Sequence, residues 1–135
     1  MNDLHNKFVE KIIEQTKEGL LKWDLVKTII NKYKAEDFDY ILFTNEFHRI
    51  NFLNSYAVIN DELNIFLLDE TFESGEDGTI NEELNLYVVE GVNGRSYRVP
   101  IDKGVLYELK DIIISKFIDS NSYLDRLLQR YIENN

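Results

Sequence analysis

Hydrophobic residues near the start of the chain recur at the spacing of an α-helix. From Leu4, apolar side chains follow at offsets of four, five, eight and nine positions, so residues 3–18 are expected to form an amphipathic helix. Gly19 comes next, where a left-handed residue commonly ends a helix. A second short helix is expected over Leu25 to Tyr33 with Asp24 as its cap, although these residues also suit a strand.

From Asp39 onward the pattern changes to short apolar runs rich in Tyr, Phe, Ile and Val, which predict β-strands. Asn93-Gly94 lies between the last two runs and tolerates the positive φ angles of a type I′ turn, so it predicts a hairpin. Asn60-Asp61-Glu62 is expected to form an earlier turn. The expected strands are residues 40–44, 55–59, 63–72, 85–90 and 96–99.

Two helical stripes close the chain, over residues 105–117 and 123–132, with capping and loop residues between them. The expected fold is α+β, an antiparallel sheet of about five strands with an N-terminal helix and two C-terminal helices packed on one face. The opposite face can be open to solvent. We expect a single domain over 1–135, helical over 1–34, acidic and β-rich over 35–100, and helical over 101–135.

Trp23 is the single tryptophan and follows the first helix closely. A role in the core is favoured over a role as an exposed binding anchor. The helix closing on Thr16-Lys17-Glu18-Gly19, followed by Leu21-Lys22-Trp23, resembles the opening of many small, uncharacterised prophage and mobile-element proteins of low-GC bacteria. Those proteins often continue with an antiparallel sheet and end in helices. They share no common activity, and the resemblance implies a defence, counter-defence or immunity role.

Composition limits the class of protein. With no cysteine, neither a disulfide framework nor thiolate chemistry is expected. We predict a cytoplasmic protein, because the start of the chain lacks the pattern of a signal peptide and the apolar runs are too short to span a membrane. A pI near 4.6 disfavours direct binding to nucleic acid or to anionic lipid, since both would repel the chain.

The negative charge is concentrated in the middle of the chain. Residues 35–94 hold fourteen carboxylates and one basic side chain, Arg49, which gives that segment a net charge of −13. The segments on either side carry +2 and +1, so the total is −10. A solubilising surface is one explanation of this clustering. A docking surface for a basic partner is the other, because such a partner would relieve the repulsion and would be steered toward it.

The sequence offers little for catalysis, and no catalytic residue and no cofactor are predicted. The two histidines, His5 and His48, are far apart, and no serine lies in a nucleophile-elbow motif. His48 could form an acid/base pair with Glu46, although a structural role is favoured. Asp69 and Glu70 adjoin on an expected strand and should point to opposite faces, which argues against a shared substrate.

Metal binding is weakly supported. Two distant histidines without cysteine do not form a usual zinc set, and no metal ligand is predicted. Asp77-Gly78-Thr79-Ile80 matches the middle of a calcium-binding EF-hand loop, but Leu84 then occupies the position of the bidentate glutamate. The flanks are also expected to be strands. An irregular Ca²⁺ or small-ligand site in the acidic loop 69–83 therefore stays open as an alternative function.

We therefore expect a non-catalytic protein that binds a basic protein partner, such as a toxin, an effector or a nucleic-acid-binding protein. The role would be that of an immunity protein, an antitoxin or a phage counter-defence inhibitor. Oligomeric state stays open. Aromatic anchors could come from Tyr40, Tyr56, Phe72 and Tyr87, of which at least half are expected in the sheet core. The acidic side chains expected to contact the partner are Asp61, Glu62, Asp69, Glu70, Glu73, Glu76, Asp77, Glu82 and Glu83.

Overall fold

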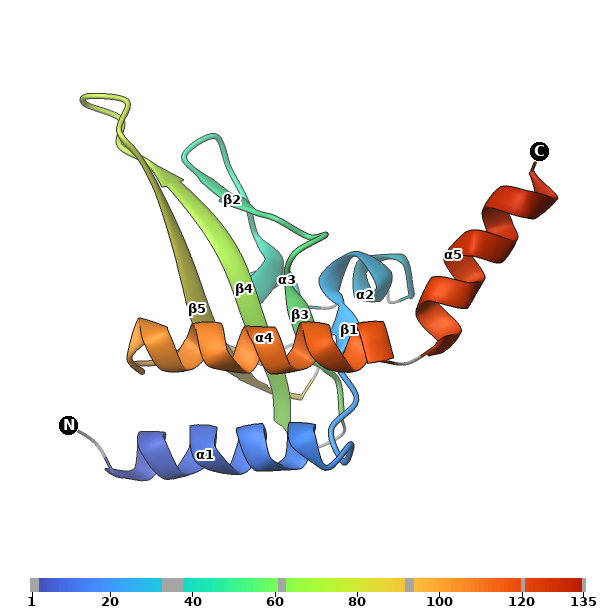
Figure 1. The fold of residues 1–135 in the computed structure, drawn as a ribbon. Coiled ribbons are helices and arrows are strands. Elements are labelled where there is room, and N and C mark those ends of the chain that lie inside the picture. The colour runs from blue at the N-terminus through green and yellow to red at the C-terminus, as the bar shows by residue number, and fades with distance from the viewer. Residues whose placement is uncertain (1–2, 33–37, 61–62, 92–93, 120, 135) are drawn as a thin grey trace.

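A computed structural model describes residues 3–32, 38–60, 63–91, 94–119 and 121–134 of the chain. Helices precede and follow a central antiparallel sheet along the chain (Figure 1). The elements in chain order are α1 (Asp3–Lys17), β1 (Asp24–Leu25), α2 (Val26–Lys32), α3 (Asp39–Leu42), β2 (His48–Ile50), β3 (Tyr56–Val58), β4 (Leu63–Glu73), β5 (Ile80–Glu90), β6 (Ser96–Val99), α4 (Lys103–Asp119) and α5 (Asn121–Glu133).

The sheet is built around one long hairpin. Strands β4 and β5 pair over their full eleven residues each, from Leu63 opposite Glu90 to Glu73 opposite Ile80. The strand order is β1-β3-β4-β5-β6, and β2 pairs with β4 beyond the end of β3. All of these pairings are antiparallel, so the predicted α+β fold class is confirmed.

One face of the sheet is covered by α1 and α4, which lie side by side in Figure 1. Alternate residues of a strand point to opposite faces, and Ile65 and Leu67 of β4 meet Leu84 and Leu86 of β5 in this core. The helices contribute apolar residues at helical spacing, among them Val9, Ile12, Leu106, Leu109 and Ile113. The predicted packing of terminal helices on one face therefore holds for α1 and α4.

Trp23 belongs to this first core, as expected, and is only 7% exposed. Its indole N–H donates a 3.0 Å hydrogen bond to the hydroxyl of Thr16, which in turn donates to the carbonyl of Ile12. Gly19 ends α1 with a φ of +76°, and the N–H of Leu20 reaches back to the carbonyl of Gln15. This is the glycine-dependent helix end that the sequence predicts.

The opposite face of the sheet was expected to be open to solvent, but part of it is covered. It carries a second apolar cluster, in which Phe66 and Leu68 of β4 are fully buried. Val26 and Ile29 of α2 cover them, and the ring of Phe38 meets that of Phe66 edge-on at 5.4 Å between centroids. The two sides of β4 therefore face separate cores, which explains its long apolar run.

The predicted strand at residues 40–44 is wrong, because this segment begins with the short helix α3. The N–H groups of Ile41 and Leu42 bond to the carbonyl of Phe38, and Ile41 is buried in the second core. Strands β1 and β2 were not predicted, since two or three residues carry no clear period. The predicted turns at Asn93-Gly94 and Asn60-Asp61-Glu62 include residues that lie outside the described ranges.

The last helix, α5, stands away from the sheet in Figure 1. Its described side chains are exposed, including Leu128 and Ile132, so the predicted packing on the sheet does not extend to this end of the helix. Within the described ranges, no helix combines the length and the apolar character that crossing a membrane requires.

Candidate functional site

The far half of the β4–β5 hairpin, residues 69–85, extends beyond the helices as a narrow projection that we call the arm (Figure 1). Its turn is held by local hydrogen bonds. The N–H of Ser74 donates to the carbonyl of Thr79 at 2.8 Å, and the N–H of Thr79 donates to the carboxylate of Asp77 at 2.9 Å. Gly78 takes a φ of +70°, which glycine adopts without strain.

Asp77 is stabilised as an anion by this turn. The backbone N–H of Thr79 is the main cause of a lowered pKa of the Asp77 carboxyl, with help from the hydroxyls of Thr79 and Ser74. A carboxylate that accepts hydrogen bonds is favoured over its protonated form. The carboxylate at the end of the arm therefore stays charged to a lower pH than an ordinary aspartate.

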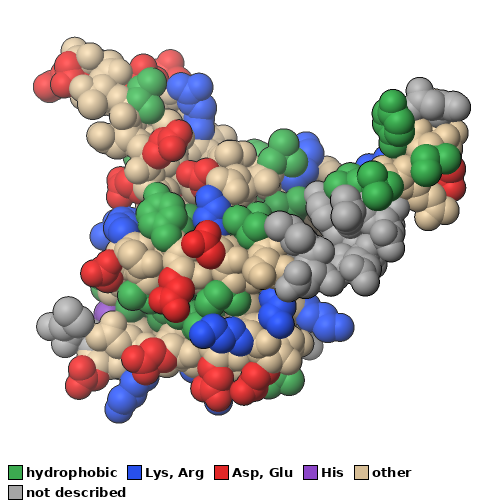
Figure 2. All heavy atoms as spheres, in the orientation of Figure 1, with side chains coloured by type: hydrophobic (Ala, Val, Ile, Leu, Met, Phe, Trp, Pro, Cys, Tyr) green, Lys and Arg blue, Asp and Glu red, His purple; other side chains and the backbone are tan. Residues whose placement is uncertain are grey.

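The end of the arm presents acids without counter-ions. Glu76, Asp77 and Glu82 are exposed, and within the described residues none of them has an ion-pair partner. Acidic side chains are visible along the projecting part of the surface in Figure 2. Like charges this close repel one another, so the arm is a place where a positive partner would be attracted.

The other acids of the arm are already engaged. Glu73 faces Arg49 of β2 at 3.4 Å, and Glu83 faces Lys103 at 3.6 Å. Asp69 accepts a 2.9 Å hydrogen bond from the side-chain amide of Asn54. These three carboxylates connect the arm to neighbouring elements, and a partner would have to compete with those contacts.

Glu70 is the exception among the acids, because it is only 2% exposed. Its carboxylate accepts hydrogen bonds from the hydroxyl of Tyr87 at 2.5 Å and from the amide of Asn85 at 3.0 Å. It also contacts the His48 ring nitrogen Nε2 at 2.5 Å, and that ring stacks on Phe72. A buried carboxylate needs such partners, so Glu70 belongs to the framework of the arm and not to its accessible surface.

The cluster continues through Asn85 to the start of α4. The ammonium of Lys103 donates to the side-chain oxygen of Asn85 at 2.6 Å and to the carbonyl of Leu84 at 2.9 Å. Burial, followed by the hydrogen bond to Glu70, raises the pKa of the Tyr87 hydroxyl. Strands β2, β4 and β5 and helix α4 are therefore joined by one polar network at the base of the arm.

The predicted binding residues thus divide into several groups. Asp61 and Glu62 lie outside the described residues. Glu76, Asp77 and Glu82 are together on the arm as expected, whereas Glu70 is buried. The predicted aromatic anchors are mostly structural: Tyr56 is in the first core, Phe72 stacks on His48, and Tyr87 binds Glu70, while the side chain of Tyr40 lies outside the description.

The chemistry available at this cluster is limited. A histidine oriented by a carboxylate supplies two of the three members of a catalytic triad. For catalysis, the other ring nitrogen of His48, Nδ1, would have to face a nucleophile. The His48 ring contacts Glu70, twenty-two positions away, and not the neighbouring Glu46, so the structural role that the sequence favours for His48 agrees with its place in this network. Asp69 and Glu70 point to opposite faces, as expected. The described residues contain no group of three or more histidines or acids able to hold a metal ion.

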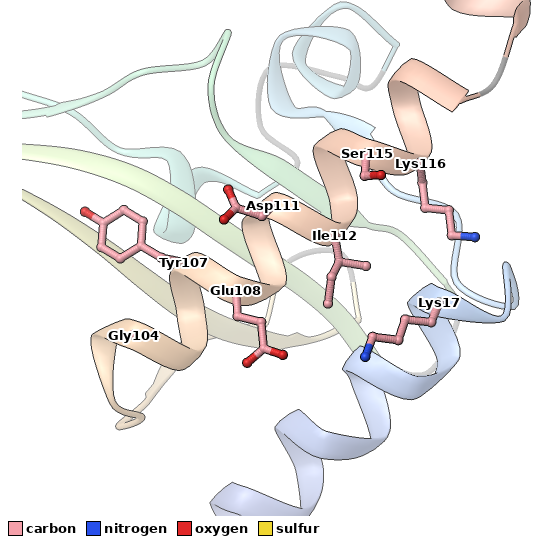
Figure 3. Close-up of a pocket in the computed structure, with 8 residues that line it drawn as sticks. All are labelled: Lys17, Gly104, Tyr107, Glu108, Asp111, Ile112, Ser115 and Lys116. Atoms are coloured by element: carbon pink, nitrogen blue, oxygen red, sulfur yellow. The ribbon is translucent and has the colours of Figure 1, made fainter.

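A separate groove runs along the outside of α4, beside the end of α1, with a volume of about 600 Å³. Figure 3 shows Tyr107, Glu108, Asp111 and Ile112 on α4, with Lys17 reaching toward them from α1. The charged side chains there are exposed and mixed in sign, as expected for two solvated helix surfaces. This groove lacks the buried polar groups that mark a specific ligand site.

Comparison of the chain with protein-family models, with curated proteins and with solved structures gives no match. The arguments about function therefore rest on the geometry and the chemistry of this molecule.

Proposed function

We propose that this protein is a non-catalytic binding protein whose arm engages a basic protein partner, as an immunity protein, an antitoxin or a phage counter-defence inhibitor would. The observation that carries the proposal is the display of Glu76, Asp77 and Glu82 on the outer part of the arm, beyond the residues that form the two apolar cores. A partner with Lys or Arg would meet these acids without first breaking an ion pair to any other residue that the structure describes.

Exposed apolar side chains add contact area on and beside the arm. Ile80 is 59% exposed and Phe47 is 49% exposed, and a side chain placed at Gly75 would touch the Phe47 ring. Interfaces commonly combine a few apolar anchors with a charged rim. The acids would speed encounter and set orientation, while the apolar side chains would slow dissociation.

Charge reversal of Glu76 and Glu82 tests this proposal, because neither carboxylate forms an ion pair with another described residue. We expect the tagged Glu76→Lys/Glu82→Lys variant to lose the partner that the parent protein captures from its host at low salt. The parent complex should itself dissociate at about 0.5 M salt, where the Debye length is roughly 4 Å. Capture is measured by quantitative mass spectrometry of the eluted proteins.

A matched control places the same change on α1. Glu10 and Glu14 are exposed on that helix, so Glu10→Lys/Glu14→Lys alters net charge equally without touching the arm. We expect this control to retain the partner. Equal capture by both variants would overturn the proposal. A melting temperature that rises with CaCl₂ in the parent, and not in the arm variant, would instead favour the Ca²⁺ alternative.

A further inference from the structure

The outer edge of β5 is paired with β6 over only four of its eleven residues. Strand β6 covers Leu86 to Val89, with Leu86 opposite Val99. Pro100 follows and turns the chain toward α4. In the described ranges, no strand pairs with residues 80–85 of β5 on the side away from β4. One side of the arm is therefore an open strand edge, formed by residues 80–85 of β5.

Hydrogen bonds define which backbone groups lie on this edge. The carbonyl of Thr79 accepts from Ser74 inside the hairpin, whereas the carbonyl of Leu84 accepts from Lys103 on the outside. Because backbone groups of successive strand residues alternate in direction, odd-numbered residues of β5 bond to β4 and even-numbered ones point outward. The N–H and C=O groups of Ile80 and Glu82 and the N–H of Leu84 therefore face outward.

We propose that an extended basic segment of a protein partner adds to this edge as a further strand, in line with β6. The inference rests on the proposed function and specifies how the arm binds. Strand addition to an exposed edge gives affinity through main-chain hydrogen bonds and specificity through alternate side chains. The segment would run in the direction of β6, which is antiparallel to β5.

Side chains near the edge indicate the sequence of that segment. A residue opposite Glu82 would share its face and meet an exposed carboxylate, so Lys or Arg fits there. A residue opposite Leu84 would lie near the ammonium of Lys103, which excludes a second cation. Beside this position lies a cavity of about 420 Å³, lined by the apolar side chains of Val99, Ile101 and Leu106 and also by Glu83, Arg98 and Lys103. An uncharged, apolar residue two positions before the basic one would pack on the apolar part of this lining.

A second copy of this chain fits the edge poorly. Pairing two β5 edges about a two-fold axis near Glu82 would place the Glu82 carboxylates of both copies close together. Like charges directly opposite each other on a sheet are destabilising. The acids of the arm thus favour a basic partner over self-association.

Amide hydrogen exchange of the full-length protein with a synthetic peptide, Thr-Val-Thr-Lys-Thr-Lys, tests this inference. At a peptide concentration of about ten times Kd, exchange at Ile80, Glu82 and Leu84 should slow roughly tenfold. Exchange at Asn81 and Glu83 should not change, since their N–H groups already bond to β4. The same peptide methylated at the amide nitrogens of valine and both lysines keeps the charge and should give no protection.

Matched variants separate backbone pairing from charge. Glu82→Pro and Glu82→Gln both lack the carboxylate, but only proline removes the outward N–H while sparing the ladder with β4. We expect Glu82→Gln to bind more weakly with the alternating protection retained, and Glu82→Pro to lose that protection. Ile80→Pro compared with Ile80→Ala repeats the test with every acid in place.

Three results would overturn strand addition. The first is hydrogen exchange that the peptide does not change, and the second is exchange that slows at odd and even residues of β5 alike. The third is equal peptide binding by each proline variant and its matched variant, Glu82→Gln or Ile80→Ala. Alternating protection that depends on protein concentration without peptide would indicate a second copy of the chain and would also overturn it. None of these results decides the proposed function, which depends on capture by the charge-reversal variants. The two proposals can therefore fail separately.

Discussion

At the scale of single residues, Glu70 shows how burial changes the role of an acid. Its carboxylate accepts hydrogen bonds from Asn85 and Tyr87 and contacts the ring nitrogen Nε2 of His48. Leaving these donors unsatisfied in the interior would cost about 1–3 kcal/mol each. We therefore expect Glu70 to stabilise the base of the arm and to have no direct part in binding.

The Tyr87→Phe variant tests this network, because it removes one donor to Glu70 and leaves the ring. We expect the free energy of unfolding at neutral pH to fall by about 1–2 kcal/mol. The folded protein raises the pKa of the Tyr87 hydroxyl above its ordinary value of 10.0. The stability that the protonated Tyr87 hydroxyl contributes to the folded state is fully present below about pH 10. It is lost as the pH rises through the higher pKa of the folded state.

The parent protein should therefore lose stability above about pH 10 more steeply than Tyr87→Phe does. Urea unfolding at a series of pH values, followed by circular dichroism, measures both slopes. Equal slopes for the two proteins would show that the hydroxyl is not buried against Glu70 as described.

At the scale of elements, α4 and α5 are adjacent helices with different roles. Leu109 and Ile113 of α4 are fully buried against the sheet. On α5, Leu127 is 43% exposed and Ile132 is 71% exposed. Packing of an apolar face supplies most of the stability of a helix in a protein, so α4 should matter far more than α5.

Removing residues 121–135 should shift the melting temperature by less than about 4 °C, equivalent to roughly 1 kcal/mol. By contrast, Leu109→Ala creates a cavity in the first core and should cost about 2–5 kcal/mol. Differential scanning calorimetry of the two variants compares them directly. A large destabilisation by the truncation would mean that α5 is packed on the body of the protein.

At the scale of the whole molecule, the uneven charge distribution should affect stability as well as binding. The acids of residues 35–94 outnumber the single base by thirteen, and three of them, on the arm, have no ion-pair partner among the described residues. Self-repulsion of this kind destabilises the compact state. Function and stability thus make opposite demands on the same side chains.

Salt should therefore stabilise the free protein. We expect the melting temperature to rise between about 0.01 M and 0.5 M NaCl, since screening shortens the range of repulsion from roughly 30 Å to 4 Å. Glu76→Lys/Glu82→Lys should melt higher than the parent at low salt and respond less to added salt. Glu10→Lys/Glu14→Lys on α1, where Lys7 and Lys11 are near in sequence, should change this response less. A parent melting temperature that is independent of salt would contradict this account.

Local patterns were enough for most elements. The helical spacing from Leu4 to Thr16 predicted α1, Gly19 predicted its end, and the apolar run from Leu63 predicted β4. These features depend on neighbours within a few positions, which any single chain displays. The β5 prediction was too short because Asn81 to Glu83 are polar, yet pairing with β4 extends the strand through them.

The candidate site divides in the same way. Clustering of acids along the chain was sufficient to point to the region of Glu76, Asp77 and Glu82. It could not distinguish these residues from Glu70, whose partners His48 and Tyr87 are twenty-two and seventeen positions away. The open edge of β5 exists because β6 pairs with residues 86–89 only, and no local sequence pattern predicts where that pairing stops.

By itself, the sequence determined the fold class, the main helices and strands, and the acidic character of the arm. Tertiary structure decided which acids are exposed, which are buried, and which strand edge is open. The physical reason is that periodicity and charge are properties of short segments, whereas burial and strand pairing depend on contacts between distant ones. Segment 40–44 illustrates this, since Ile41 entered the second core as part of a helix although its neighbours favour a strand.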